Sequence, residues 1–390
     1  MSELDTFPGF QLLGQATEEG SQPKHERLRD FVASQIESGR LAAGTLLPSE
    51  HRIAEMWQVA RSTVRQAMST LERDGLVRRV HGKGTYIHEQ ARQRLKRGQD
   101  IFALILPETE TGFYPSLQKS FEAAAAEIHS QVIVCNSNNE VDRQGNIILQ
   151  LIDHRVAGVA IVPTTNPPTP SFHIRQLQQH GIPVVCCSRS VEGAFAPLLA
   201  IPFEEVGKMA GEALRSHGHQ HVAFISGTLT EAVKRMLRGF QSALGNSSKI
   251  QFLHGTSGSP NVADHEAEVA AQLDQLLAET PRPTAIFATF DTFAELLFVL
   301  LSQRGIRVPE DISIVGFGGT RRTGALISRL TSVSLDEHEL GQQAVELLNR
   351  MRNGTMSLDT VEQNLISIRL SEGQTLQAPT GEKKGHPIGH

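Results

Sequence analysis

Residues 61–87 read RSTVRQAMSTLERDGLVRRVHGKGTYI, and this stretch decides the fold of the first part of the chain. Apolar side chains recur at helical spacing in its first half, which predicts a helix over residues 61–74 that ends at Gly75. Residues 76–80 and 85–87 are two short apolar strands around the turn HGKG, which predicts a hairpin. The inward face of the helix is expected to consist of Val64, Ala67, Met68 and Leu71.

Two further helices are expected upstream. Residues 24–38 place apolar side chains on one helical face, and Gly39 follows as a stop. A short helix opens after Pro48, where Ser49 is a suitable cap and Glu50 is favourable in the first turn. Residues 1–21 lack periodicity. Three helices and a hairpin over residues 22–88 predict a winged helix-turn-helix, which is a DNA-binding fold.

The charge distribution agrees with this interpretation. The whole chain of 390 residues has a formal net charge of −5. Residues 22–98, however, hold 15 basic and 8 acidic side chains, so this part is positive and the remainder is strongly negative. A basic head on an acidic body is expected when one end of a protein meets phosphates.

The predicted recognition helix carries the residues that would read DNA. Arg61 and Arg65 lie four residues apart on its outward face, where arginine can pair with guanine in the major groove. Hydroxyl groups at the helix start can bind phosphate, and Gly82 lets the wing backbone approach the DNA. The predicted DNA-binding residues are Ser49, Arg61, Ser62, Thr63, Arg65, Gln66, His81, Gly82 and Lys83.

Residues 28–87 resemble the winged helix of the GntR family. The matching phrases are IESGRL at 36–41, GTLLPSE at 44–50, RSTVRQA at 61–67, LERDGLV at 71–77 and HGKGTYI at 81–87. The resemblance implies that Arg61, Thr63 and Arg65 lie in the recognition helix and that His81 and Gly82 form the wing tip. Two positions depart from the family pattern: His51 replaces an arginine, and Ala60 replaces a capping Ser or Thr. A missing cap costs about 1 kcal/mol.

Behind a polar, basic linker at residues 89–99, strands and helices alternate. This alternation predicts parallel sheets covered by helices, hence an α/β body over residues 100–378, and its length favours two lobes. We expect lobe one to contain 100–201 and 320–333, and lobe two 204–317 and 335–370. Helices are expected at 117–128, 204–214 and 292–303. The strand candidates are 101–106, 132–135, 156–162, 183–187, 222–226, 250–253, 285–289 and 312–317.

The body resembles the effector domains of LacI/GalR-type repressors and the related periplasmic binding proteins. The segments that match are IPVV at 182–185, GHQHVAFI at 218–225, GFQSAL at 239–244 and RGIRVPEDISIVGF at 304–317. A GntR-type head on such a body resembles the arabinose-type repressors. The resemblance implies a small-molecule effector in the cleft between the lobes, at the carboxyl ends of strands. The candidate effector-binding residues are Phe113, Tyr114, Arg189, Phe203, Arg235, Phe290 and Asp291.

Several polar pairs of that family are missing here. Pro202-Phe203 replaces Asp-Asn, Phe290-Asp291 replaces Asn-Asp, and Gly318-Gly319 replaces an Asp pair. Either the effector is a sugar-like molecule or a more apolar, aromatic metabolite, or the cleft has lost its ligand and a partner or the protein's abundance controls the regulator. At Phe203 and Phe290, simple packing between the lobes is an equally good explanation.

The remaining signals exclude other classes of protein. No signal peptide or membrane-length apolar run is present, and the three cysteines, Cys135, Cys186 and Cys187, indicate no disulfide framework, so we expect a cytoplasmic protein. No nucleophile elbow, phosphate loop or dinucleotide motif suggests an enzyme or a cofactor. The alternating histidines 217, 219 and 221 are interpreted as a connector and not as a metal site. We therefore expect a homodimeric repressor on a pseudo-palindromic operator; a solute-binding protein is the less favoured alternative.

Overall fold

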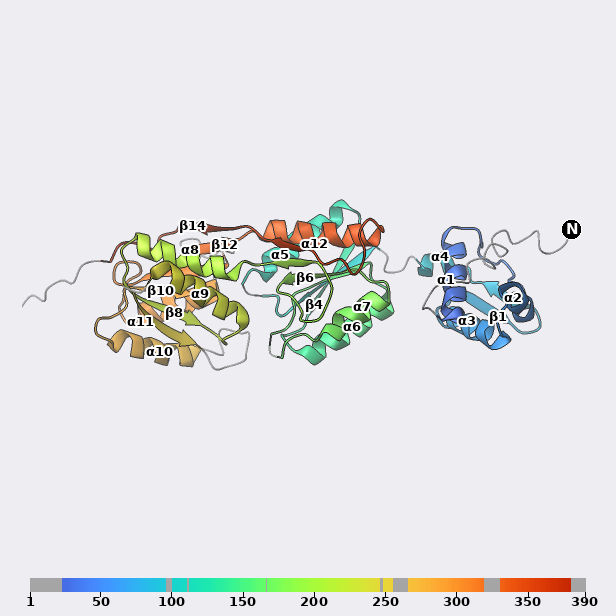
Figure 1. Cartoon of the computed structure of the whole chain (residues 1–390), viewed down its shortest axis with the longest axis horizontal. Coiled ribbons are helices and arrows are strands. Elements are labelled where there is room, and N and C mark those ends of the chain that lie inside the picture. Colours follow the sequence, from blue (N-terminus) through green and yellow to red (C-terminus); the bar gives the residue numbers. More distant parts are fainter. Residues whose placement is uncertain are drawn as a thin grey trace, which may run out of the picture. The chain divides into compact units, whose positions relative to one another are not determined.

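The computed structural model describes residues 23–95, 100–110, 112–165, 167–245, 248–254, 266–318 and 330–379. The chain divides into two compact units, Met1–Asp100 and Ile101–His390 (Figure 1). Each unit has hydrophobic clusters of its own. We call the first unit the head and the second unit the body.

The head contains the expected three helices and hairpin. They are α1 (Lys24–Glu37), α2 (Glu50–Trp57), α3 (Arg61–Arg73), β1 (Val77–Val80) and β2 (Gly84–Ile87). The two strands pair antiparallel with Val77 opposite Ile87 and Val80 opposite Gly84. The predicted inward face of α3 is buried, as are Leu28, Val32 and Ile36 of α1. The period of the apolar residues thus predicted both helices correctly.

The head extends further than expected. Residues 91–95 of the predicted linker form helix α4 (Ala91–Leu95), and Ala91 and Leu95 are buried in the same cluster as Leu28. The basic composition of residues 89–99 concealed these two apolar positions, which lie four apart on one helical face. Residues 96–99 lie outside the described part of the chain.

The body contains two six-stranded sheets, and all eight predicted strands occur in them. The first sheet has the order β13-β7-β6-β5-β3-β4 and is parallel throughout. The helices that pack with it are α5 (Tyr114–Glu127), α6 (Val141–His154), α7 (Ser171–Gln179) and α12 (Glu337–Arg352). The strands are β3 (Ile101–Leu106), β4 (Gln131–Asn136), β5 (Gly158–Ile161), β6 (Val184–Ser188), β7 (Leu198–Ala200) and β13 (Gln363–Leu365).

The second sheet has the order β14-β12-β11-β10-β8-β9, in which only the edge strand β14 runs antiparallel to its neighbour. Its helices are α8 (Phe203–Ser216), α9 (Glu231–Leu244), α10 (Glu266–Ala278) and α11 (Asp291–Gln303). The strands are β8 (His221–Ser226), β9 (Lys249–His254), β10 (Ala285–Ala288), β11 (Ser313–Gly318), β12 (Thr331–Leu335) and β14 (Ile368–Ser371).

The lobe assignment of the last part of the chain was wrong. Strand β12, whose first three residues fall in the range predicted for lobe one, pairs with β11 in the second sheet. Helix α12 and strand β13, predicted for lobe two, pack on α5 and pair with β7 in the first lobe. Residues 320–329 lie outside the described residues. Periodicity predicts an amphipathic helix but does not show which lobe it packs on.

Helices α8 and α9 approach each other unusually closely in the second lobe. A Cβ atom on Gly239 would lie 1.8 Å from the backbone oxygen of Glu204, and one on Gly207 would lie 1.8 Å from that of Met236. Only hydrogen fits between the two backbones at these two points. The glycine pair therefore fixes the spacing of the helix pair that covers one face of the second sheet.

Gly239→Ala should lower the free energy of unfolding of the body by about 3 kcal/mol or more, because the added methyl must force the two helices apart. In an uncrowded helix the same change would stabilise by about 1 kcal/mol, so the sign of the effect is diagnostic. Denaturant unfolding of the full chain measures it. Gln241→Ala, an exposed change on the same helix, is the control and should be nearly neutral.

Candidate DNA interface and effector site

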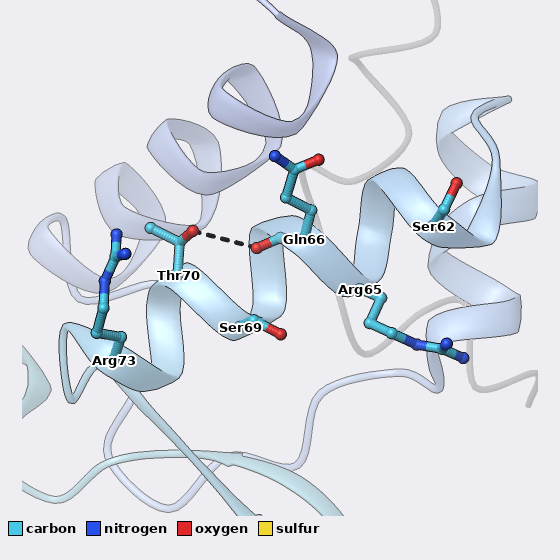
Figure 2. A pocket seen from close by; sticks show the side chains of 6 residues that line it. All are labelled: Ser62, Arg65, Gln66, Ser69, Thr70 and Arg73. Atoms are coloured by element: carbon cyan, nitrogen blue, oxygen red, sulfur yellow. Dashed lines mark hydrogen bonds between the residues drawn. The ribbon is translucent and has the colours of Figure 1, made fainter.

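The outward face of α3 lines a shallow groove on the head. Figure 2 shows the six side chains that line it, spread along the length of the helix. Arg61, Ser62, Arg65 and Gln66 are exposed, as predicted for a DNA-reading face, whereas Thr63 is half buried. Thr70 donates a hydrogen bond from its hydroxyl to the Gln66 carbonyl, 3.1 Å away (Figure 2). The groove residues are Ser62, Arg65, Gln66, Ser69, Thr70 and Arg73.

The Glu50 carboxylate lies between the recognition helix and the wing. Glu50 Oε2 lies 3.5 Å from Arg65 Nε, and Glu50 Oε1 lies 3.2 Å from an Arg79 guanidinium nitrogen on β1. Glu72 also faces Arg79, at 3.4 Å. These pairs are too exposed to add much stability, but they orient both arginines. From the sequence, Glu50 was expected only to favour the first turn of α2, and no role was predicted for Arg79.

The starts of α2 and α3 differ as their sequences predict. Ser49 caps α2: its hydroxyl oxygen accepts a hydrogen bond from the Arg52 backbone N–H at 3.3 Å. Ala60 precedes α3 and provides no side-chain cap. His51 is exposed, with Nε2 3.3 Å from Glu55. The departure at Ala60 therefore leaves the first turn of the recognition helix without a capping side chain.

The wing turn presents one cation on a constrained backbone. His81, Gly82 and Lys83 are exposed, as expected. Gly82 has a φ of +73°, a conformation that a side chain would disfavour. The Lys83 N–H donates to the Val80 carbonyl at 2.9 Å, and the Tyr86 hydroxyl donates to the Lys83 carbonyl at 3.2 Å. The turn thus holds the Lys83 backbone in place and leaves its ammonium group outside.

In the body, two predicted effector residues meet on the first lobe. Tyr114, the first residue of α5, lies close enough to Arg189, which follows β6, for the guanidinium charge to act on its hydroxyl group. Burial raises the pKa of Tyr114, and the charge of Glu108 adds to this, while Arg189 opposes it. Phe113 is only 2% exposed and belongs to the hydrophobic core, with its ring 4.5 Å from that of Tyr114. Phe113 therefore packs against Tyr114 from the core, and its own ring is not available to contact a ligand.

Four buried polar atoms near the ends of parallel strands have no hydrogen-bond partner within the described protein. They lie at or just after the carboxyl ends of β6, β10 and β12, where α/β folds bind ligands. Because an unsatisfied buried polar group costs about 1–3 kcal/mol, several of them together indicate a binding site. Ser188 also has a φ of +72°, and strain of this kind is common at ligand sites. The atoms are Ser188 Oγ, Arg189 Nε, Thr289 Oγ1 and Glu337 Oε1.

The second lobe contributes a buried acid. Asp291 begins α11, is 4% exposed, and accepts a hydrogen bond from the Ser332 hydroxyl at 2.7 Å. A Cβ on Gly316 would lie 2.2 Å from Asp291 Oδ1, so this carboxylate depends on a glycine beside it. Glu337, the first residue of α12, was not predicted. Its pKa is raised from 4.5 to about 7, mainly by burial; the charges of Asp336 and Asp291 contribute to the rise, while a hydrogen bond to its own backbone and the charge of Arg369 oppose it.

The other predicted effector residues are placed differently. Phe203 is 5% exposed within the core and packs against Phe317 with a centroid distance of 6.2 Å. Phe290 is only partly buried, and its ring lies 6.0 Å from that of Phe317. Packing thus accounts for Phe203, whereas Phe290 keeps an accessible part. Arg235 is exposed on α9.

Two of the three histidines near β8, His217 and His219, form hydrogen bonds within the protein. His219 bonds through Nδ1 to the Thr284 hydroxyl at 2.8 Å and through Nε2 to the Gln377 carbonyl at 2.9 Å, and burial lowers its pKa. His217 Nδ1 lies 2.8 Å from the Ala213 carbonyl. In the described ranges, no three His, Cys, Asp or Glu side chains are grouped to hold a metal ion. No helix in those ranges has the length and apolar character to cross a membrane.

Glu337→Gln should stabilise the body at alkaline pH. The folded state holds a proton on Glu337 that the unfolded state releases above pH 4.5, so ionisation of this group lowers stability as the pH rises from 4.5 to 7. The variant lacks that loss and should be more stable by on the order of 2 kcal/mol at pH 8, with no gain at pH 4. Thermal unfolding across this range measures the difference, and an equal effect at both pH values would contradict it. Glu346→Gln, exposed on the same helix, is the control.

Comparison with known proteins matches both units. Residues 24–87 match the model of the bacterial regulatory proteins of the gntR family, and residues 211–376 match that of the periplasmic binding protein-like domain. The arabinose metabolism transcriptional repressor of Geobacillus stearothermophilus is 29% identical over 85% of this chain and 92% of its own length. Catabolite control protein A of Priestia megaterium is 25% identical, covering 79% and 87%.

Solved structures share the fold of the body. The transcription regulator CcpA of Lactococcus lactis superposes with a TM-score of 0.57 and 18% identity, covering 71% of this chain and 99% of that one. A LacI family regulator of Enterococcus faecium with bound ribose gives a TM-score of 0.58 and 21% identity, covering 72% and 100%. The chain is therefore a DNA-binding transcriptional regulator that joins a GntR-family winged helix-turn-helix to a LacI/GalR-type effector domain, as in the arabinose-type repressors that it resembles.

Proposed function

We propose that the protein is a repressor that binds a pseudo-palindromic operator as a homodimer and is controlled by a small molecule bound between the lobes of the body. The observation that carries the DNA-binding part is the exposed face of α3, where Arg61 and Arg65 occupy the first turns beside a basic wing. A helix start of this kind fits the major groove, and two heads related by a twofold axis fit two half-sites. A protein with this role acts in the cytoplasm, where its operator is.

Four unpartnered buried atoms favour a retained effector over a cleft that has lost its ligand. A site without a ligand gains nothing from leaving Ser188, Arg189, Thr289 and Glu337 unsatisfied, since apolar replacements would remove the cost. Binding to these groups, which come from both lobes, would stabilise one arrangement of the lobes over another. A regulator responds to its effector through such a difference in affinity between two states. The gntR-family match argues against a transport protein.

Arg65→Ala should weaken specific operator binding by about 1–3 kcal/mol, because it removes a side chain placed to contact a base. Arg65→Lys keeps the positive charge but cannot pair bidentately with guanine, so it should lose much of the same specificity. The operator is first selected from random duplexes with the full-length protein, and an inverted repeat is expected. If both variants bind the operator and random DNA with the wild-type ratio, Arg65 does not read bases.

Arg189→Ala should abolish effector binding. The full-length protein is screened by thermal unfolding against sugars, sugar acids, nucleosides and aromatic metabolites, and a ligand at a hundred times its dissociation constant should add about 2.7 kcal/mol of stability. A hit that Arg189→Ala removes, and that the exposed Arg238→Ala on α9 leaves intact, places the ligand at the predicted site. A hit that survives Arg189→Ala would place it elsewhere, and no hit in the whole panel would favour the cleft without a ligand.

A further inference from the structure

A pair of polar side chains connects the start of the first helix to the recognition helix. His25 lies in the first turn of α1, and its Nε2 atom is 3.2 Å from the amide nitrogen of Gln66 on α3. Gln66 is exposed and lines the groove of α3, whereas His25 is half buried. The two residues are 41 positions apart in the sequence, so the fold alone brings them together.

The apolar core behind this pair holds the two helices at a fixed distance. Leu28 and Val32 lie three and seven residues after His25, which places all three on one face of α1. Leu28 and Val32 are fully buried, in the cluster that also contains Val64 and Met68 of α3. The imidazole therefore lies beside α3 because the helices are packed, and this arrangement exists before any DNA is bound.

The chemistry of the two atoms sets the direction of their hydrogen bond. An amide nitrogen can only donate, so the imidazole Nε2 of His25 accepts, and the ring carries its proton on Nδ1. This bond uses one N–H of the Gln66 amide. The second N–H and the carbonyl oxygen of the amide remain for a ligand, one as a donor and the other as an acceptor.

A donor next to an acceptor matches one base in the major groove. Adenine presents its N7 acceptor beside its N6 donor, and a glutamine amide can pair with both, whereas guanine presents two acceptors. Arg65 carries donors alone and therefore suits guanine. In Figure 2 the Gln66 amide and the Arg65 guanidinium group point in different directions from α3, so the two side chains are placed to meet different base pairs.

We propose that His25 is a positioning residue of the DNA interface, which holds the Gln66 amide in the orientation that reads an adenine of the operator. The inference rests on the DNA-binding function proposed above. An unconstrained glutamine side chain loses rotamer freedom when it is ordered on DNA, and the bond to His25 supplies this order in advance. A histidine that contacted only a phosphate would instead add affinity for every sequence alike.

The direction of the hydrogen bond gives the proposal a signature. An acceptor at position 25 keeps the Gln66 amide as it is, with its oxygen available to the DNA. A donor at position 25 attracts that oxygen, so the amide turns and offers its N–H groups to the DNA, which fits the two acceptors of guanine. The donor or acceptor character of residue 25 should thus decide the preferred base, independently of its charge.

The experiment selects the operator from random duplexes with the full-length protein and its variants, and compares the base frequencies at each position. In Gln66→Ala, we expect the adenine preference to disappear at one position of each half-site. His25→Ala should weaken the same preference by about threefold or more. His25→Glu, an acceptor, should keep the adenine, and His25→Lys, a donor, should shift the preference toward guanine.

The main control repeats the two charged variants in the Gln66→Ala background. There, His25→Glu and His25→Lys should still differ in overall affinity, because one adds a negative and the other a positive charge beside the DNA. They should no longer differ in the preferred base at that position. Glu26→Gln removes the carboxylate 3.9 Å from His25 Nε2 and leaves the bond to Gln66 in place, so the base preference should be that of the wild type. Thermal unfolding shows that each variant is folded.

Two outcomes would overturn the inference. If Gln66→Ala leaves every base preference unchanged, Gln66 reads no base. If Gln66→Ala removes a preference that all three His25 variants keep, His25 does not position the amide. In either case, an operator that still depends on Arg65 leaves the proposed DNA-binding function standing. If the wild-type protein selects no sequence at all, that function fails together with the inference.

Discussion

The chain crosses between the two lobes of the body at three places, and hydrogen bonds connect these crossings to one another. The chain passes between the sheets after β7, after β12 and after β13. The Ile366 N–H donates to the Ala200 carbonyl at 2.9 Å, and the Asp336 N–H donates to the Ser367 carbonyl at 3.0 Å, so each crossing is bonded to another. A side-chain bond from the Ser367 N–H to Glu339 at 2.9 Å adds to them. Any change in the angle between the lobes must occur at these few residues.

The proposed effector groups lie close to the same crossings in sequence. Glu337 follows the second crossing directly, and Ile201, after the first, is bonded to Ser188. A ligand that contacts Ser188, Arg189, Asp291 and Glu337 would act on both lobes next to the points where they can turn. Small shifts at the ligand can then become a rotation of whole lobes, because packed sheets move as rigid bodies. A ligand at these groups would in this way change the angle between the lobes without a change inside either sheet.

The sequence predicted the parts of the fold that periodicity controls. The apolar face of α3, the cap at Ser49, the absent cap at Ala60 and the eight strands all follow from local patterns. The lobe that receives α12 does not, because two similar lobes compete for the same amphipathic helix. In the same way, Glu337 was indistinguishable from any acid in the first turn of a helix. Its raised pKa arises mainly from burial in the folded chain, with smaller contributions from Asp336 and from Asp291, which lies 46 positions earlier in the sequence. Tyr114 and Arg189 stay predictions from the family resemblance, whereas Phe113 is packed in the core.

The carboxylate of Glu50 between Arg65 and Arg79 has a consequence for how tightly the head can hold any duplex. In a complex formed through α3, this carboxylate stays at the interface as a fixed anion and competes with the DNA for the same guanidinium groups. Fewer condensed cations are then released from the duplex than the number of arginines suggests, and the loss of affinity with added salt is correspondingly shallow. Random DNA, which offers phosphates alone, is penalised more than a site that also offers a base edge. A competing carboxylate of this kind lowers the affinity for all DNA but increases the difference in affinity between the operator and random DNA.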